Sequence, residues 1–492
     1  MTKSYTRIAL QVTLLSILHN ISFSQTIINS NIFTNTNWVI TGSPYIITTD
    51  LIVFEGATLT VDPGVTIKVY NNMGIEFRGK LYAVGNATDS ITFTSNAVSP
   101  VMGTWRGLTF SGTTNPLGSG DQATMDYCKG MYALTFLDLD IAYHGPYRFD
   151  HCFFYKNGKV NYDGGMPKTF FSHCLFFENN TGLSYVQFGG TASHCVFLHN
   201  NNAVDGFENI DSSYFSGNTG VALAPYGSAK SCIVENNNIA VKCLFNAVNN
   251  NFTHNYICDN TAGIEMQSFF NGSIQFTNNT ICNNALFNIN YTWPNNANLA
   301  YNCWCTTDSA SIRSKIYDGY SPGSSSGLVN FMPLSVSCNR PTLCTVNLCP
   351  VTNSTIMKAV IPGTTYQWQI NNGNGYVNLA DNNFHSGSNT GSLQLINIPS
   401  DWYGYQYRCI VDGTKNTAPG KIIFVDTWAG TVDAEWGNPA NWICNSVPDN
   451  NTDVFINSGN VIVNSNTICR SLTVKQGATY KVNTGFNLTI TH

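Results

Sequence analysis

The sequence SHCVFLHNN, at residues 193–201, has two near-copies upstream, DHCFFYKNG at 150–158 and SHCLFFENN at 172–180. The Asn near the end of each copy serves as a reference for the rest of the chain. The same register recurs downstream, and the reference column contains Asn157, Asn179, Asn200, Asn218, Asn237, Asn260 and Asn284. A repeat of roughly 20 residues is typical of a solenoid, in which each repeat stacks on its neighbours.

Two further columns lie at positions that point to the same face of a β-strand. Three positions before each Asn stand large apolar residues, namely Phe154, Phe176, Phe197 and Phe215, followed by Val234, Ile257 and Ile281. Five positions before it stand small or polar residues, namely Cys152, Cys174, Cys195 and Cys232, with Ser213, Asn255 and Asn279. Because side chains alternate along a strand, both columns are predicted to face the interior.

Short runs of β-branched and aromatic residues, separated by Asn and Gly, indicate strands rather than helices. Stacked coils of this kind form a right-handed parallel β-helix, in which identical residues lie in ladders. The Asn column is expected to sit in left-handed turns and to hydrogen-bond along the stack. The Cys column is predicted to stay reduced, because in-register neighbours are ~4.8 Å apart and a disulfide prefers Cβ atoms ~3.5–4.5 Å apart.

Next to the Cys column runs a His column, which contains His151, His173 and His194, then Ser212, Ser231 and His254. As strand neighbours of the cysteines, these residues are expected to face outward near a corner. Three stacked imidazoles could bind a transition metal. No carboxylate or thiolate column is predicted on the same face, so we expect a structural stack and no metal site.

Other outward positions are unusually apolar, and they comprise Phe153, Leu175, Val196, Tyr214, Ile233 and Tyr256, together with Tyr155, Phe177 and Leu198. Two interpretations are open. The strip lies beneath an inserted loop, or it is a binding face. The second interpretation makes Tyr155, Phe177, Tyr214 and Tyr256 the candidate ligand-binding residues.

The composition and the N-terminus restrict location and partners. Only 10% of residues are charged, and no Lys/Arg cluster is present that would bind nucleic acid. Lys3 and Arg7 precede the apolar run IALQVTLLSIL at 8–18, which is the layout of a secretory signal peptide covering residues 1–24. The alternative is a membrane anchor, but the run is shorter than the ~20 residues of a spanning helix. An extracellular or cell-surface location, with no membrane span in the mature chain, is therefore expected, and the oligomeric state stays open.

The tetrads FYKN (154–157), FFEN (176–179), FLHN (197–200) and FSGN (215–218) resemble repeats of surface-displayed bacterial β-helix proteins, including polymorphic outer-membrane proteins and adhesins. The segment NCWCTTDSASIRSKIYDGYSPGSSSGLVNFMPL (302–334) is similar to the closing segment of pectin-lyase-like β-helix domains in secreted Bacteroidota proteins. LIVFEGATLTVDPGVTIKV (51–69) and GKLYAVGNATDSITFTSN (79–96) resemble the first coils of the same group. The resemblance implies a β-helix domain over residues 25–337.

Two further modules are expected downstream. A Cys/Pro linker, CNRPTLCTVNLCP at 338–350, precedes residues 351–426, which resemble an immunoglobulin-like β-sandwich. In that resemblance Trp368 is the core Trp and Tyr407 the tyrosine corner, and Cys344 or Cys349 is the partner expected for Cys409. The connectivity of Cys303, Cys305 and Cys338 stays open.

Residues 427–492 end in LTVKQGATYKVNTGFNLTI (472–490), which realigns with LIVFEGATLTVDPGVTI (51–67). This C-terminal module is expected to be β-rich and solenoid-like, with a disulfide between Cys444 and Cys469. The chain stops at His492 without the sorting domain that secreted Bacteroidota proteins of this kind usually carry, so either a truncated sequence or another export route is expected.

The stretch FLDLDIAYHGPYRFDH (136–151) carries the best candidate chemistry. Asp138 and Asp140 share a strand face, and His144 and Arg148 follow. No cofactor is expected, although paired carboxylates could bind Ca²⁺ or act as acid and base. The alternative is a solvated polar strand face.

We therefore expect an all-β, adhesin-like extracellular protein whose partner is a polysaccharide or cell-surface glycan. The alternatives are a polysaccharide lyase or glycoside hydrolase and a purely structural stalk. Tandem modules on a solenoid suit display more than turnover, an expectation drawn from architecture alone.

Overall fold

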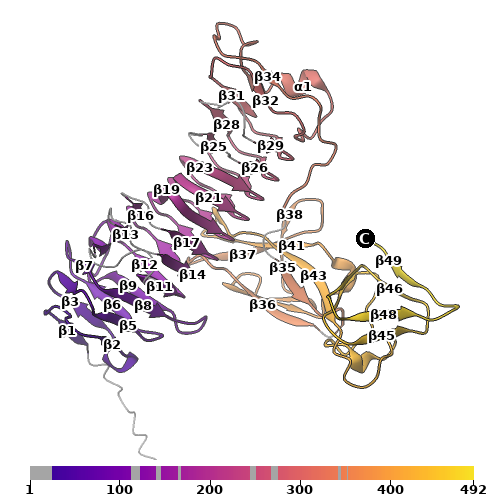
Figure 1. Ribbon diagram of the computed structural model, residues 1–492, viewed down its shortest axis with the longest axis horizontal. Helices are drawn as coiled ribbons and strands as arrows, with labels where there is room; N and C mark the ends of the chain where they lie inside the picture. The colour runs from indigo at the N-terminus through magenta and orange to yellow at the C-terminus, as the bar shows by residue number, and fades with distance from the viewer. Residues whose placement is uncertain are drawn as a thin grey trace, which may run out of the picture.

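The computed structural model describes residues 25–111, 122–139, 146–163, 168–243, 251–267, 275–341, 345–351 and 353–492. Figure 1 shows a long solenoid with two smaller β-rich modules beside it. The predicted signal peptide, residues 1–24, lies outside the described residues. The chain is an all-β protein, and its parallel sheets form a parallel β-helix.

Three parallel ladders make up the solenoid. The first is a 12-stranded sheet of β1 (Thr26–Ile28), β3 (Tyr45–Ile47), β6 (Thr66–Val69), β9 (Ile91–Ser95), β12 (Cys128–Met131), β15 (Phe153–Tyr155), β18 (Leu175–Phe177), β20 (Val196–Leu198), β22 (Tyr214–Ser216), β24 (Ile233–Glu235), β27 (Tyr256–Cys258) and β30 (Thr280–Cys282).

The second ladder, here called the β7 sheet, contains β4 (Leu51–Val53), β7 (Gly74–Phe77), β10 (Gly107–Phe110), β13 (Thr135–Leu139), β16 (Lys159–Asp163), β25 (Ile239–Cys243), β28 (Ala262–Met266), β31 (Ile289–Tyr291) and β33 (Ile316–Tyr317). The third, here called the β8 sheet, contains β2 (Thr36–Trp38), β5 (Thr58–Val61), β8 (Lys80–Val84), β11 (Ala123–Asp126), β14 (Tyr147–Asp150), β17 (Thr169–Ser172), β26 (Asn251–Thr253) and β29 (Gln275–Thr277). The two ladders merge in the middle coils, where the long strands β19 (Thr181–Ser193), β21 (Asn202–Asp211) and β23 (Val221–Lys230) belong to both.

The interior of the solenoid is lined by stacked residues. Phe154, Phe176, Phe197 and Phe215 are fully buried, and successive rings lie with centroids 5.1, 4.4 and 4.6 Å apart. Burying each ring stabilises the fold by about 1.5–3 kcal/mol. The cysteines of the predicted ladder, Cys152, Cys174, Cys195 and Cys232, are buried free thiols.

The Asn column forms a continuous chain of side-chain hydrogen bonds. In each coil Nδ2 donates to the Oδ1 of the next Asn at 2.8–3.2 Å, from Asn157 through to Asn284. The expected left-handed conformation lies one residue earlier, at Lys156, Glu178, His199, Gly217, Asn236, Asp259 and Asn283. The Asn side chain therefore supports the turn from inside, while a polar or small residue supplies the positive φ.

The His-Cys pairs lie at a corner rather than on a strand, which corrects the sequence-based interpretation. The backbone φ lies between 47° and 59° at His151, His173, His194 and His254. In each His-Cys pair the Cys follows the His and comes directly before the next strand. This corner separates the β8 sheet from the 12-stranded sheet, so the imidazoles face outward while the thiols point into the core.

Beyond the closing coil, which carries the short helix α1 (Ser309–Arg313), two sheets form a sandwich module. One sheet contains β35 (Thr345–Leu348), β37 (Tyr366–Asn371), β38 (Tyr376–Asn378), β41 (Gln406–Val411), β42 (Lys415–Asn416) and β43 (Gly420–Thr427), and the other contains β36 (Ser354–Lys358), β39 (His385–Ser386) and β40 (Ser392–Ile396). Trp368 and Tyr407 are buried between them. The Tyr407 hydroxyl lies 3.0 Å from Nε2 of His385. The immunoglobulin-like assignment stays a prediction.

The C-terminal module consists of stacked parallel strands. β44 (Thr452–Ile456), β45 (Asn460–Val463) and β46 (Thr467–Cys469) pair with β47 (Ser471–Val474), β48 (Thr479–Val482) and β49 (Leu488–Ile490). β43 of the sandwich module pairs in parallel with β44, so the two modules share one sheet.

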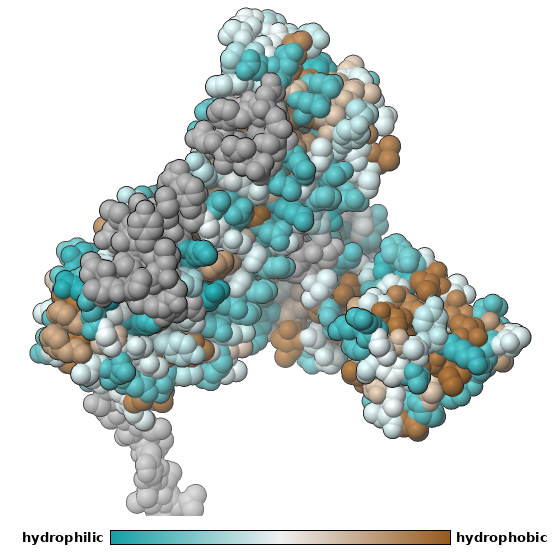
Figure 2. Space-filling model, viewed as in Figure 1, coloured by the Kyte–Doolittle hydropathy of each residue, from teal (hydrophilic) through white to brown (hydrophobic). Residues whose placement is uncertain are grey.

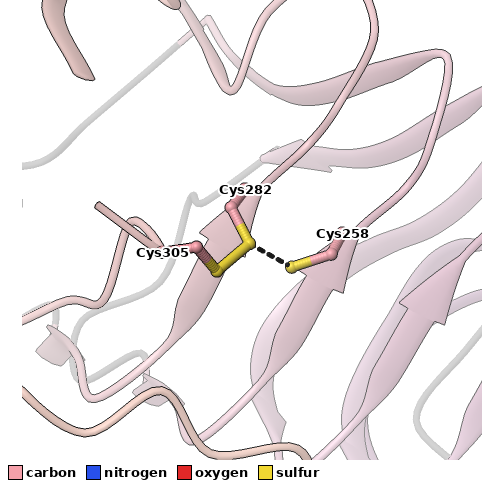
Figure 3. A group of neighbouring side chains, drawn as sticks. All are labelled: Cys258, Cys282 and Cys305. Carbon is pink, nitrogen blue, oxygen red and sulfur yellow. Dashed lines mark hydrogen bonds between the residues drawn. A yellow bond between two sulfur atoms is a disulfide. The ribbon is translucent and has the colours of Figure 1, made fainter. Parts of the chain in front are cut away.

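Three disulfides occur among the described residues. Cys303 pairs with Cys338, Cys282 with Cys305 and Cys349 with Cys444. Figure 3 shows Cys258 beside the second pair, its Sγ 3.0 Å from that of Cys282.

The predicted Cys444–Cys469 disulfide is wrong. Cys444 approaches β35 of the sandwich module, where Cys349 lies with a Cα–Cα distance of 5.5 Å. Cys469 is a buried free thiol. Cys409, for which Cys344 or Cys349 was expected as partner, is also free and buried, and Cys344 lies outside the described residues.

The junction of the two modules contains a carboxylate with a displaced pKa. Asp426 is buried; its Oδ1 accepts hydrogen bonds from the backbone of Thr427 and Cys444, whereas Oδ2 has no partner among the described residues. Burial raises the pKa of Asp426 to about 6. The folded state therefore disfavours the charged form, and this destabilisation is absent below about pH 4 and grows as the pH rises through 6.

We expect Asp426→Asn to raise the free energy of unfolding at pH 7.5 by about 1–2 kcal/mol, less than the ~3 kcal/mol of a two-unit shift, because the new amide also lacks a partner. At pH 4 this advantage should vanish. Urea unfolding of both proteins across this range measures the difference. A difference that does not change with pH would contradict the assignment. Asp433→Asn is the control, since hydrogen bonds lower the pKa of Asp433 and the substitution should act in the opposite direction.

Candidate functional site

The predicted ligand-binding strip is covered by the sandwich module. Phe177 and Tyr214 are buried, and Tyr155 and Tyr256 are partly buried against the same apolar cluster, which includes Leu348, Trp368, Leu393 and Phe424. The prediction that these four aromatic residues form an exposed ligand face is therefore wrong. The other interpretation is correct in that the strip is covered, but the cover is the sandwich module and not an inserted loop.

Ion pairs lie at the edge of the contact between the strip and the sandwich module. Lys415 forms an ion pair with Glu178, and Arg340 Nη2 lies 2.8 Å from Glu235 Oε1. The Tyr214 hydroxyl donates to the same carboxylate at 2.9 Å. Because apolar packing and paired charges occur together, the sandwich module is held on β18, β20, β22 and β24, and this face is not open to a ligand.

The predicted catalytic residues do not form one site. Asp138 lies on β13 of the β7 sheet, whereas Arg148 lies on β14 of the β8 sheet, with its guanidinium over the Phe170 ring at 4.8 Å. Asp140 and His144 lie outside the described residues. Of the predicted candidates, Asp138 borders a cavity.

That cavity is a groove on the outer face of the β7 sheet, with a volume of about 530 Å³. It is here called the β7 groove, and the residues that matter are Asp50, Glu76, Arg106, Thr109, Thr135 and Asp138. The strand register aligns Ile52, Glu76, Thr109, Asp138 and Tyr162 in one outward column across five coils. In Figure 1 this sheet follows the edge of the solenoid away from the C-terminal modules.

A second hollow of about 510 Å³ shares Glu76 and extends the groove toward Phe54 and Arg78. The Phe54 ring stacks on Phe33 at 4.6 Å, and Phe33 is 65% exposed. At the far end of the column Tyr162 is 49% exposed. The groove is thus a polar floor between exposed aromatic rings.

The charged groups of the groove are paired with one another. Arg78 donates to both oxygens of Glu76, at 2.7 and 3.3 Å, and Ser111 donates to Oε1 at 2.5 Å. The hydrogen bond from Arg78 is the largest cause of a lowered pKa of Glu76; together with smaller contributions from Ser111 and Arg106 it outweighs the effect of burial. Arg106 forms an ion pair with Asp50. The groove therefore presents ionised, oriented donors and acceptors.

Two glycines lie at the floor of the groove where an added side chain would have little or no room. A Cβ at Gly74 would lie 3.3 Å from the Arg106 side chain, and one at Gly107, whose φ is +117°, would lie 1.7 Å from the Thr135 carbonyl oxygen. A repeated pattern in the sequence could have revealed the β7 groove. GIEF (74–77) and GLTF (107–110) share one pattern, which places Glu76 and Thr109 in register before the F-x-x-N repeat begins.

Comparison with known proteins supports this class of fold. Residues 32–135, which contain most of the β7 groove, match the family described as "Pectate-lyase like beta helix domain". Residues 427–492 match one described as "Domain of unknown function (DUF8693)". A search of curated proteins found no match to the chain. The chain is a parallel β-helix protein, and its residues 32–135 are similar to the pectate-lyase-like β-helix domain.

Location is constrained more loosely. The disulfides are compatible with an extracellular protein. No helix among the described residues is long and apolar enough to cross a membrane.

Proposed function

We propose that the chain is an exported, adhesin-like protein that binds polysaccharide in the β7 groove. The observation that carries the proposal is the concentration of oriented polar groups there. Only 10% of the chain is charged, yet Asp50, Glu76, Arg78, Arg106 and Asp138 all line this groove or its extension.

The chemistry of the groove suits sugars. Sugar hydroxyls both donate and accept hydrogen bonds, so alternating carboxylates and guanidiniums can bind them. The aromatic faces of Phe33 and Tyr162 offer apolar surfaces for the C–H faces of a sugar ring. A groove open along its length, rather than a closed pocket, favours a chain over a small molecule. Acidic groups slightly outnumber basic ones, so a neutral polysaccharide is the best fit.

A polysaccharide lyase or hydrolase is the second candidate, favoured by the family match over residues 32–135. Glu76 and Asp138 are two strands apart in the outward column, which corresponds to ~9.6 Å between backbones. Inverting glycosidases separate their carboxyl groups by about 6.5–9.5 Å. A general acid must keep its proton at neutral pH, and the lowered pKa of Glu76 disfavours that role for Glu76, so in an enzyme Asp138 would be the acid and Glu76 the base. Binding is preferred because of the oriented, paired charges described above.

The test is affinity electrophoresis of the full chain in gels that contain neutral or acidic polysaccharides, together with a reducing-end assay. Asp138→Asn and Arg106→Ala are each expected to weaken binding about tenfold, because each removes a charged hydrogen-bonding group. Glu265→Gln is the matched control. Glu265 lies on β28, in the outward column of the same sheet, beyond the groove.

Retardation that both groove variants lose and the control keeps would support the proposal. Equal retardation of all four proteins, or none with any polysaccharide, would overturn it. Release of reducing ends that Asp138→Asn abolishes would make the enzyme the correct function.

A further inference from the structure

The corner that follows β11, β14 and β17 brings imidazoles and carboxylates together. His151, His173 and His194 stack with ring centroids 4.8 and 5.2 Å apart, and Tyr127 stacks on His151 at 4.5 Å. Carboxylates were not expected on this face. Asp126 and Asp150, each the last residue of its strand, nevertheless reach around the corner to the imidazoles. We call Asp126, Asp150, His151 and His173 the corner cluster.

The donor atoms of the corner cluster have the spacing of a metal site. Asp150 Oδ1 lies 3.2 Å from Nδ1 of both His151 and His173, and these three atoms all lie within 4.8 Å of one another. Asp126 Oδ1 lies 3.5 Å from His151 Nδ1 but is not one of the three mutually close atoms. Ligands at ~2.0–2.2 Å from a tetrahedral Zn²⁺ are about 3.3–3.6 Å apart, so the printed spacings fit a shared ion.

Hydrogen bonding alone does not account for this arrangement. Asp150 Oδ1 already accepts from the His151 backbone N–H at 3.0 Å and from the Ser172 hydroxyl at 2.7 Å. A carboxylate oxygen has about two lone pairs, yet two imidazole nitrogens also face it. Asp126 Oδ1 is buried without a hydrogen-bond partner among the described residues. A cation would relieve the crowding at Asp150 Oδ1.

We propose that Asp150, His151 and His173 bind one Zn²⁺, which joins two successive coils of the solenoid. Two imidazoles and one carboxylate are a borderline donor set that suits Zn²⁺ better than Ca²⁺, because Ca²⁺ prefers oxygen ligands alone. The imidazoles are partly exposed, so the ion can enter from solvent. The site lies on residues outside the β7 groove and does not depend on what the groove binds.

The other close group of ligating side chains is a weaker candidate. Cys258, Cys282 and Cys305 lie together (Figure 3), but two of the three sulfurs form a disulfide. Burial raises the pKa of the remaining Cys258 thiol to about 12, which disfavours the thiolate that a metal needs.

The test uses the full-length oxidised protein and ZnCl₂ alone. Isothermal titration calorimetry is expected to show one equivalent bound, Co²⁺ is expected to give the visible absorption of a four-coordinate site, and Zn²⁺ is expected to raise the Tm. His151→Asn, His173→Asn and Asp150→Asn should each weaken binding at least tenfold, since even second-shell losses cost 10–100-fold. Asn is chosen for the His variants because it tolerates the left-handed backbone.

The matched controls are His254→Asn and Asp211→Asn, which lie in the same two columns outside the corner cluster. Both should bind Zn²⁺ as the unmodified protein does. The proposal is overturned if the unmodified protein shows no saturable Zn²⁺ binding. It is equally overturned if the three cluster variants keep full affinity and the Zn²⁺-dependent rise in Tm. If either His variant fails to fold, Asp150→Asn still tests the proposal, because this substitution preserves the shape of the side chain.

Discussion

Replacing Asn179 by Ala is expected to lower the free energy of unfolding by about 3–5 kcal/mol. The Asn179 side chain accepts from the backbone N–H and from Nδ2 of Asn157, and it donates to the Phe154 carbonyl and to Asn200 Oδ1, all at 2.9–3.0 Å. The alanine variant leaves the Asn157 N–H buried without its partner and removes one of the hydrogen bonds of the Phe154 carbonyl. A buried group without its partner costs about 1–3 kcal/mol, and the missing amide adds a cavity.

Asn180→Ala is the matched control, because Asn180 is the exposed neighbour of Asn179 and contacts one exposed amide, that of Asn201. Its cost should stay within about 0.5 kcal/mol. Urea unfolding followed by tryptophan fluorescence measures both variants. Equal stability of the two variants would show that the Asn column does not support the coils.

The second large effect is expected at the disulfide between the sandwich and C-terminal modules. Cys349 and Cys444 are 95 residues apart in the sequence, and closing so long a loop restricts the unfolded chain. The chain-entropy model gives ~4.7 kcal/mol for about 100 residues, and measured values are usually 2–4. We therefore expect Cys349→Ser/Cys444→Ser to lose about 3 kcal/mol in the unfolding of these two modules.

Cys469→Ser is the control, since Cys469 is a buried free thiol and its replacement should leave the cross-link in place. Peptide mapping of the unreduced protein provides the direct check. It should yield a linked pair of peptides that contain residues 349 and 444, with residue 469 alkylated only after denaturation. A linked pair containing residues 444 and 469 would instead restore the disulfide expected from the sequence.

The periodic part of the chain was predictable because each repeat reports on its neighbours. Phe154, Phe176 and Phe197 recur at one offset from an Asn, and a single strand parity then places them in the core. Local backbone detail was less accessible. The positive φ belongs to residues such as Lys156 and Glu178, whose identities vary, so no column reveals it.

Contacts between modules were not predictable from the repeat. Phe177 and Tyr214 point outward from their own coils. The sequence around them does not show that they pack in one cluster with Trp368 and Phe424, which lie well over a hundred residues later. The Cys349–Cys444 disulfide was missed for the same reason. The β7 groove was missed in part because Asp50, Glu76 and Arg106 precede the regular repeat, where coil lengths vary and registers are hard to count.

The Asn column also has an electrical direction. From Asn157 to Asn260, one Nδ2–H of each side chain points to the next coil and Oδ1 points to the previous one, while the second Nδ2–H donates to a backbone carbonyl of the previous coil. The amide dipoles therefore add along the solenoid axis, as peptide dipoles do in an α-helix, with the positive end toward Asn284. Neighbouring amides polarise one another. Replacing an Asn in the middle of the column therefore divides it into two shorter, weaker hydrogen-bonded chains, whereas replacing an Asn at the end shortens a single chain.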